Sequence, residues 1–198
     1  MKKRKTILIS IFMLFFSFNF SFSQEINSEY KTSVFEVYGD LNKDQIQDLV
    51  TVKENEDDPK HPFLLEIFFK NKSGKYEKVL TSEKAVMELY PYGDRRTELI
   101  LRDLLIENGI LIFKNELIRG SFIHRFRFQN GRFELIGFTS VNANPGSIEH
   151  IDFNLSTWQK IVKLMSYETD KVLKLEKTKQ KVSPLPNLVD FTPFDFTY

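Results

Sequence analysis

Side chains that carry oxygen recur at alternate positions in one short stretch of the chain. They are Asp40, Asn42 and Asp44, and Asp48 follows four residues later. Ca²⁺ is a hard cation that takes about six to eight oxygen ligands in flexible geometry, and a tight loop can supply them from alternate residues. The backbone carbonyl of Ile46 is placed to add one more oxygen while its side chain points into a core. We therefore expect these five residues to bind one Ca²⁺.

An apolar, β-branched run over residues 49–52 follows this loop, so the loop leads directly into a strand. The layout resembles the Asp-x-Asn-x-Asp-x-x-x-Asp loop of FG-GAP and VCBS-type repeats, of integrin-like propeller blades and of dockerins. The resemblance covers residues 39–52, and it implies that the oxygen-bearing side chains ligate calcium.

Two residues depart from that pattern. Gln45 stands where such loops usually have glycine, and a left-handed backbone there carries a modest strain cost for a residue with a Cβ. Thr51 occupies the position at which an EF-hand has its bidentate Glu, so the stretch is not an EF-hand. The alternative interpretation is a polar β-turn with an Asx cap and no metal.

Composition limits the classes of protein that this chain can belong to. The 198 residues include no cysteine, which excludes a disulfide scaffold, thiolate metal sites and a Cys nucleophile. The formal net charge is +1, but residues 1–23 hold four basic residues and no acidic ones. The remainder has 24 basic against 27 acidic residues, a net charge of −3. That balance is not the footprint of a nucleic-acid-binding domain, so we expect no nucleic-acid partner.

Residues 1–23 have the order of a secretory signal peptide. Basic residues at 2–5 precede an apolar run over 7–20, and Ser21 and Ser23 are the small residues that a signal peptidase reads. We expect cleavage before Gln24 and a location in the periplasm or outside the cell. The alternative is an uncleaved membrane anchor, but the run is short for a bilayer span and Ser and Asn interrupt it. We expect no stable membrane span after cleavage.

The rest of the chain alternates in the manner of short β-strands. We expect a mainly β fold of antiparallel hairpins that form a sandwich or paired blade-like sheets, with at most one short helix, over residues 82–89. A flexible lead-in at 24–32 precedes a β-rich domain at 33–182, with a subdivision near 90–95 left open, and a Pro/aromatic tail at 183–198 is expected to run along the surface. The expected strands are 33–38, 48–53, 63–69, 75–80, 98–104, 109–113, 122–128, 132–138, 148–155, 159–167 and 171–179.

No residue pattern indicates catalysis. His124 shares a strand face with aromatic residues, which favours a packed core position, and neither zinc-ligand spacing nor a nucleophile elbow is present. Arg125, Arg127 and Arg132 project from one predicted hairpin. Seven lysines follow later in the chain, at 160, 163, 171, 174, 177, 179 and 181. We interpret these residues as the solvated face of antiparallel strands, with lysines at an edge, and the alternative is a surface for an anionic polysaccharide or a partner protein. We expect an exported β-rich binding or structural module whose partner, a protein or a polysaccharide, is unknown. The alternative is a small secreted hydrolase with an unrecognised site.

Overall fold

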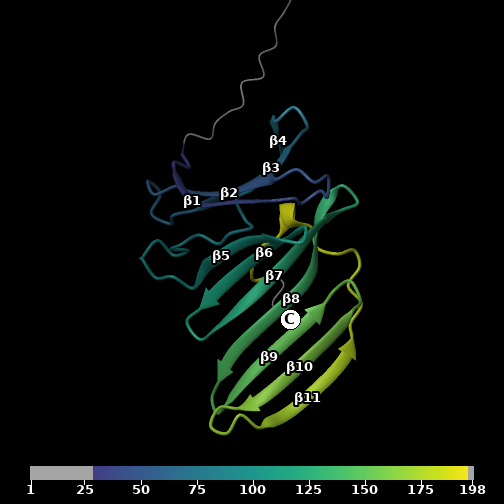
Figure 1. The fold of residues 1–198 in the computed structure, drawn as a ribbon. Helices are drawn as coiled ribbons and strands as arrows, with labels where there is room; N and C mark the ends of the chain where they lie inside the picture. Colours follow the sequence, from purple (N-terminus) through teal and green to yellow (C-terminus); the bar gives the residue numbers. More distant parts are fainter. Residues whose placement is uncertain (1–28, 196–198) are drawn as a thin grey trace, which may run out of the picture.

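The computed structural model describes residues 29–195. The expected signal peptide, its expected cleavage site before Gln24 and the last aromatic residues, Phe196 and Tyr198, lie outside the described residues. The described chain is mainly β and forms two antiparallel sheets, which confirms the expected fold class (Figure 1). Within this part of the chain a single 3-10 helix, η1 (Leu188–Asp190), is the only helical element.

All eleven expected strands are present, and within each sheet strands that are consecutive in the chain lie side by side. The small sheet has the order β1-β2-β3-β4 and the large sheet the order β11-β10-β9-β8-β7-β6-β5. The bounds of the small sheet's strands are β1 (Thr32–Gly39), β2 (Asp48–Glu54), β3 (Phe63–Lys70) and β4 (Tyr76–Ser82). Those of the large sheet are β5 (Leu99–Glu107), β6 (Ile110–Leu117), β7 (Gly120–Gln129), β8 (Arg132–Asn144), β9 (Ser147–Asn154), β10 (Gln159–Ser166) and β11 (Val172–Lys179).

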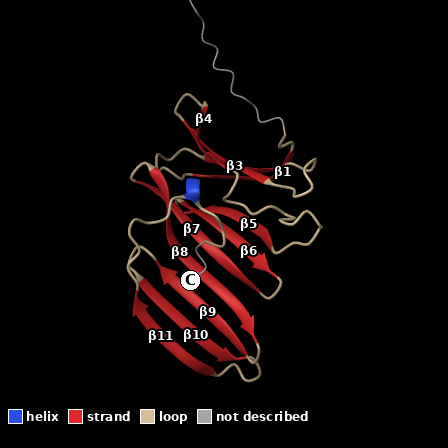
Figure 2. Ribbon diagram, turned by 180° about the vertical axis from the view of Figure 1, so that it is seen from behind, coloured by secondary structure: helices blue, strands red, loops and turns tan. Residues whose placement is uncertain are grey.

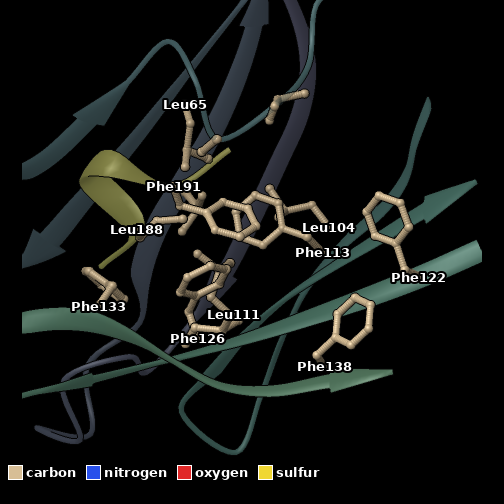
Figure 3. Close-up of a cluster of buried hydrophobic side chains, with 14 of the residues drawn as sticks. Leu65, Leu104, Leu111, Phe113, Phe122, Phe126, Phe133, Phe138, Leu188 and Phe191 are labelled. Carbon is tan, nitrogen blue, oxygen red and sulfur yellow. The ribbon is translucent and has the colours of Figure 1, made fainter. Parts of the chain in front are cut away.

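The small sheet covers one end of the large sheet, and β9, β10 and β11 extend away from it (Figures 1 and 2). Alternate residues of each sheet meet in one core, as the two-residue period of a strand requires. Figure 3 shows side chains of both sheets in this cluster, among them Leu65 of β3, Leu104 of β5 and Phe113 of β6. One shared apolar core therefore joins the two sheets.

The C-terminal tail completes this core, which differs from the expected course along the surface. Leu188 and Phe191 are buried, and the Phe191 ring lies 4.9 Å from the Phe126 ring in a T-shaped contact. The backbone N–H of Leu135 donates to the carbonyl of Pro186 at 2.8 Å. The tail is held at the first residues of β8, before the pairing of β8 with β9 begins at Gly137, and its apolar side chains are buried in the core.

The expected helix over residues 82–89 is wrong, because this segment forms bends. The Ser82 hydroxyl accepts the backbone N–H groups of Lys84 and Ala85, as a helix cap would. The amides further along donate elsewhere, however, since Leu89 N–H reaches the carbonyl of His61 at 3.1 Å. Tertiary hydrogen bonds and burial of Ala85 therefore replace the helical ladder.

The far strand of the large sheet, β11, pairs only with β10 and is exposed at every residue. Its apolar side chains Leu173 and Leu175 are more than half exposed. Lysines stand between them along the strand, as at edge strands that resist pairing with another chain. Over residues 29–195 no helix is long and apolar enough to cross a membrane.

Candidate functional site

The loop between β1 and β2 is held by its own oxygen-bearing side chains. The Asp40 carboxylate accepts the backbone N–H groups of Asp44, at 3.1 Å, and of Gln45, at 2.9 Å. Asn42 Oδ1 accepts the N–H of Asp44 at 3.0 Å, and Asp44 Oδ1 accepts the N–H of Ile46 at 2.8 Å. The bonds accepted by Asn42 and Asp44 are two successive Asx turns, and Asp40 closes the loop across them from four and five residues away. The side-chain oxygens of Asp40 and Asn42 thus converge on the N–H of Asp44.

The backbone conformation of Gln45 is left-handed, with φ 69°, as its place in the loop requires. Lys43 is also left-handed, with φ 65°. A residue with a Cβ adopts this region at a modest energetic cost, so the surrounding structure must hold it there. The Asx turns on both sides supply that constraint.

Asp48 differs from the other carboxylates of the loop because it is fully buried. Its Oδ2 accepts the N–H of Leu41 at 2.9 Å, and its Oδ1 accepts the N–H of Lys70 at 3.1 Å. Burial raises the pKa of Asp48, and the backbone donors oppose that rise in part. Asp48 therefore ties the start of the loop to the end of β3.

The loop lies where the two sheets meet. Leu41, between two of the oxygen carriers, is fully buried in the shared core. A Cβ on Gly39 would collide with Ile106 of β5, and a Cβ on Gly109 would lie 3.4 Å from the carbonyl oxygen of Asp40. The conformation of this loop is therefore coupled to the packing of β1 against the β5–β6 hairpin.

The donor set suits Ca²⁺ in chemistry, since it combines carboxylates, an amide oxygen and a carbonyl. Each carboxylate oxygen has two lone pairs, so an oxygen that accepts an N–H can still ligate a cation. Among residues 29–195, however, no three His, Cys, Asp or Glu side chains are grouped so that they could hold a metal ion. A site here therefore needs Asn42 and the Ile46 carbonyl together with the carboxylates.

A second candidate site lies on the outer face, which we define as the face of the large sheet that carries Arg125 and points away from the core. A hollow of about 730 Å³ opens there across β6 to β10. The residues that line it are Ile110, Arg125, Arg127, Ile136, Gly137, Thr139, His150, Ile151, Asp152, Phe153, Asn154, Ile161 and Lys163.

Sequence reasoning named the two arginines of this hollow and, among the later basic residues, Lys163, but it missed Gly137. Gly137 lies within the long strand β8, and a glycine inside a strand often marks a close approach of a ligand or of another backbone. That glycine was the available signal. The sequence did not predict that Lys163 lies near the arginines, because the neighbours of β10 depend on the order of strands in the sheet.

The three histidines lie on different parts of the fold. His124 is fully buried among aromatic rings, as expected, and its ring centroid lies 4.8 Å from that of Phe191. His61 Nδ1 lies 2.6 Å from Glu54 Oε1, and His150 lines the outer hollow. The structure therefore does not gather them into one site.

Comparisons of this chain with models of protein families, with curated proteins and with solved structures found no match. The likeness to calcium loops therefore stands on residues 39–52 and on the loop geometry described above.

Proposed function

We propose that this chain is an exported binding module, periplasmic or extracellular, whose loop over residues 40–48 holds one structural Ca²⁺. The observation that carries the calcium assignment is the set of side-chain to backbone hydrogen bonds from Asp40, Asn42 and Asp44 around a left-handed Gln45. The side chains of Asp40, Asn42, Asp44 and Asp48 and the carbonyl of Ile46 would ligate the ion. When bound, the ion would neutralise carboxylates that crowd one turn.

A structural role fits the position of the loop better than a sensing role. The loop lies against both sheets through Leu41, Gly39 and Gly109, so an ion there would hold the junction of the fold. Extracellular calcium modules bind with Kd values of about 10⁻⁴ to 10⁻³ M, which millimolar calcium saturates. The chain has no cysteine, and such an ion would supply part of the cross-linking that disulfides give to other exported domains.

A binding role is supported by the outer face rather than by any catalytic arrangement. That face presents a hollow with charged side chains that extends across β6 to β10. The alternative of a small hydrolase has no comparable observation in its favour, since the histidines lie apart.

Calorimetry and thermal melting of the purified full chain test the calcium assignment. We expect binding heat for one Ca²⁺ and a higher melting temperature in millimolar calcium than in excess EDTA. Equal melting temperatures in both buffers, together with no binding heat, would show that the loop is only a polar turn. Magnesium is the matched control ion, because it prefers a stricter octahedral geometry and retains its water.

The export assignment has its own test, because it rests on residues 1–23. Mass spectrometry of the protein made in its own host should find a chain that starts at Gln24. A chain that retains Lys2 in the membrane fraction would support the anchor instead.

A further inference from the structure

The side chains of the outer face form a local excess of positive charge. Arg125 and Arg127 project there because Phe122, His124 and Phe126, at the intervening positions of β7, point into the core. Lys163 on β10 lines the same hollow, and Asp152 is the only carboxylate in its lining. The chain after residue 23 has a net charge of −3, so this face differs in sign from the protein as a whole.

These cations have no carboxylate partner within the described chain. None of Arg125, Arg127 and Lys163 takes part in an ion pair among residues 29–195. Glu134, opposite Arg127 in the register, is instead engaged by Arg132 at 2.6 Å. Protection of a sheet edge does not explain the two arginines, because β7 lies inside the sheet with β6 and β8 on either side.

Gly137 makes room for the hollow and helps to position one guanidinium. It pairs with Arg125, and a Cβ at Gly137 would lie 3.5 Å from Arg125 Cδ, so the stem of the arginine lies over the glycine. Arg125 then donates from Nη1 to Thr139 Oγ1 at 2.7 Å. The backbone of Gly137 is not left-handed, so its conformation does not require glycine. A larger residue at position 137 would instead fill part of the hollow above the sheet.

The geometry points to an anionic polysaccharide that carries carboxylates, such as a polyuronate, as the ligand of this hollow. The planar guanidinium fork matches a carboxylate and can bind it with two parallel hydrogen bonds. Thr139, Asn154 and His150 offer hydrogen-bonding groups for sugar hydroxyls, and Ile110 and Ile161 offer apolar surface for a ring. An acidic peptide is the less suitable ligand, because an extended peptide pairs its backbone at a sheet edge and this hollow lies on a face.

This inference rests on the proposed binding function and names its ligand class, so the experiment separates the two. The full chain is titrated with oligogalacturonate by calorimetry, in calcium, at low and at high salt. Dextran is the neutral comparator and polyglutamate the acidic-peptide comparator. We expect binding to oligogalacturonate that weakens at high salt, weaker binding to polyglutamate and none to dextran.

Variants locate the binding on the hollow. The double variant Arg125→Gln/Arg127→Gln should weaken oligogalacturonate binding by about tenfold or more, because it removes both guanidinium forks. The matched control, Arg95→Gln/Arg102→Gln, removes the same charge from exposed positions outside the lining and should change affinity by less than about twofold. Gly137→Val should weaken binding without any change of charge, since it fills the hollow. Each variant must retain the calcium-dependent melting temperature of the unaltered chain.

Three outcomes would overturn the inference. Binding of polyglutamate as tight as that of oligogalacturonate, with the same dependence on the two arginines, would assign the face to an acidic protein partner and leave the binding function in place. An equal loss of affinity in the two double variants would show that oligogalacturonate binding depends on the net charge of the protein and not on this hollow. If the chain bound neither oligogalacturonate nor polyglutamate, the hollow would not be a binding site. The calcium titration of the same sample tests the loop independently.

Discussion

The carboxylate of Asp48 accepts the backbone N–H of Lys70 at 3.1 Å, although 22 residues separate them in the chain. The same side chain accepts the N–H of Leu41, at the start of the loop. One buried carboxylate thus joins the loop, the first residue of β2 and the last residue of β3. This arrangement gives Asp48 a structural role that does not depend on a metal.

We predict that Asp48→Asn destabilises the protein even in EDTA. The amide keeps the shape of the carboxylate, but its Nδ2 must face an N–H donor, so a buried hydrogen bond is lost. The free energy of unfolding should fall by about 1–3 kcal/mol, measured by urea titration. Asp103→Asn, on the exposed surface of β5, is the control and should change it by less than about 0.5 kcal/mol. Equal stability of Asp48→Asn and the unaltered chain in EDTA would contradict this role.

Asp44→Ala, unlike Asp48→Asn, should destabilise the protein mainly when calcium is present. Removal of the Asp44 side chain loses the hydrogen bond from the Ile46 N–H, but Asp44 is exposed and water replaces that acceptor, so the melting temperature in EDTA should fall much less than in calcium. In calcium it should remove a stabilisation that follows mass action, about 2.7 kcal/mol at a hundredfold excess of ion over Kd. Asp58→Ala is the matched control, because Asp58 Oδ1 accepts the N–H of Lys60 in an Asx turn outside the loop. A calcium response that survives in Asp44→Ala would exclude this residue as a ligand.

Glu66 predicts a pH dependence of stability. Burial alone would raise the pKa of Glu66, but hydrogen bonds and charges of Lys53 and Lys78, each at 3.0 Å, hold that pKa below its ordinary value of 4.5. A carboxyl whose pKa is lower in the folded state than in the unfolded state stabilises the fold at any pH above the unfolded-state pKa. This stabilisation is lost as the pH falls through the folded-state pKa. Unfolding free energies should therefore decline below about pH 4.5.

Glu66→Gln should lower the stability at neutral pH by about 1.5–3 kcal/mol and make the decline in acid shallower. Glu176→Gln is the control, since Glu176 pairs with Lys174 at an exposed edge and such pairs contribute about 0–1 kcal/mol. An acid limb of unchanged slope in Glu66→Gln would show that other carboxyls dominate it.

Phe191→Ala tests the role of the tail in the core. The Phe191 ring is buried between β7 and the small sheet, so its removal should lower the unfolding free energy by about 3–5 kcal/mol. Phe194→Ala, at a position that is 40 % exposed, should have a clearly smaller effect. Similar losses of unfolding free energy in both variants would mean that the tail is held by contacts along its length and not mainly by the buried Phe191 ring. Denaturant unfolding measures both.

Local signals in the sequence were sufficient to predict the strands. Asn108-Gly109 and Asn130-Gly131 are hairpin turns, and all four of these residues have positive φ. Within each sheet every strand pairs with the strand that precedes or follows it in the chain, so no long-range choice of partner had to be made there. The end of β8 was predicted too early because its continuation is stabilised by β9, which follows it.

The features that the sequence could not predict are those that depend on distant partners. Residues 82–89 have a cap-like Ser82, but the amides beyond it are taken by the loop that contains His61. The burial of Phe191 follows from the space left between two sheets. The spacing of the loop predicted its oxygen carriers and the left-handed Gln45, yet it contained nothing to show that Asp48 reaches β3.

The solitary pairing of β11 with β10 implies a gradient of local opening across the large sheet. Amide hydrogens of β11 have one neighbouring strand and no buried side chains to protect them, so they should exchange with solvent through fraying. Amides of β7 and β8, beneath the aromatic cluster, should exchange only when the whole molecule unfolds. A protease would therefore cut first near the β10–β11 turn, and the sheet would be lost strand by strand from that edge towards the junction.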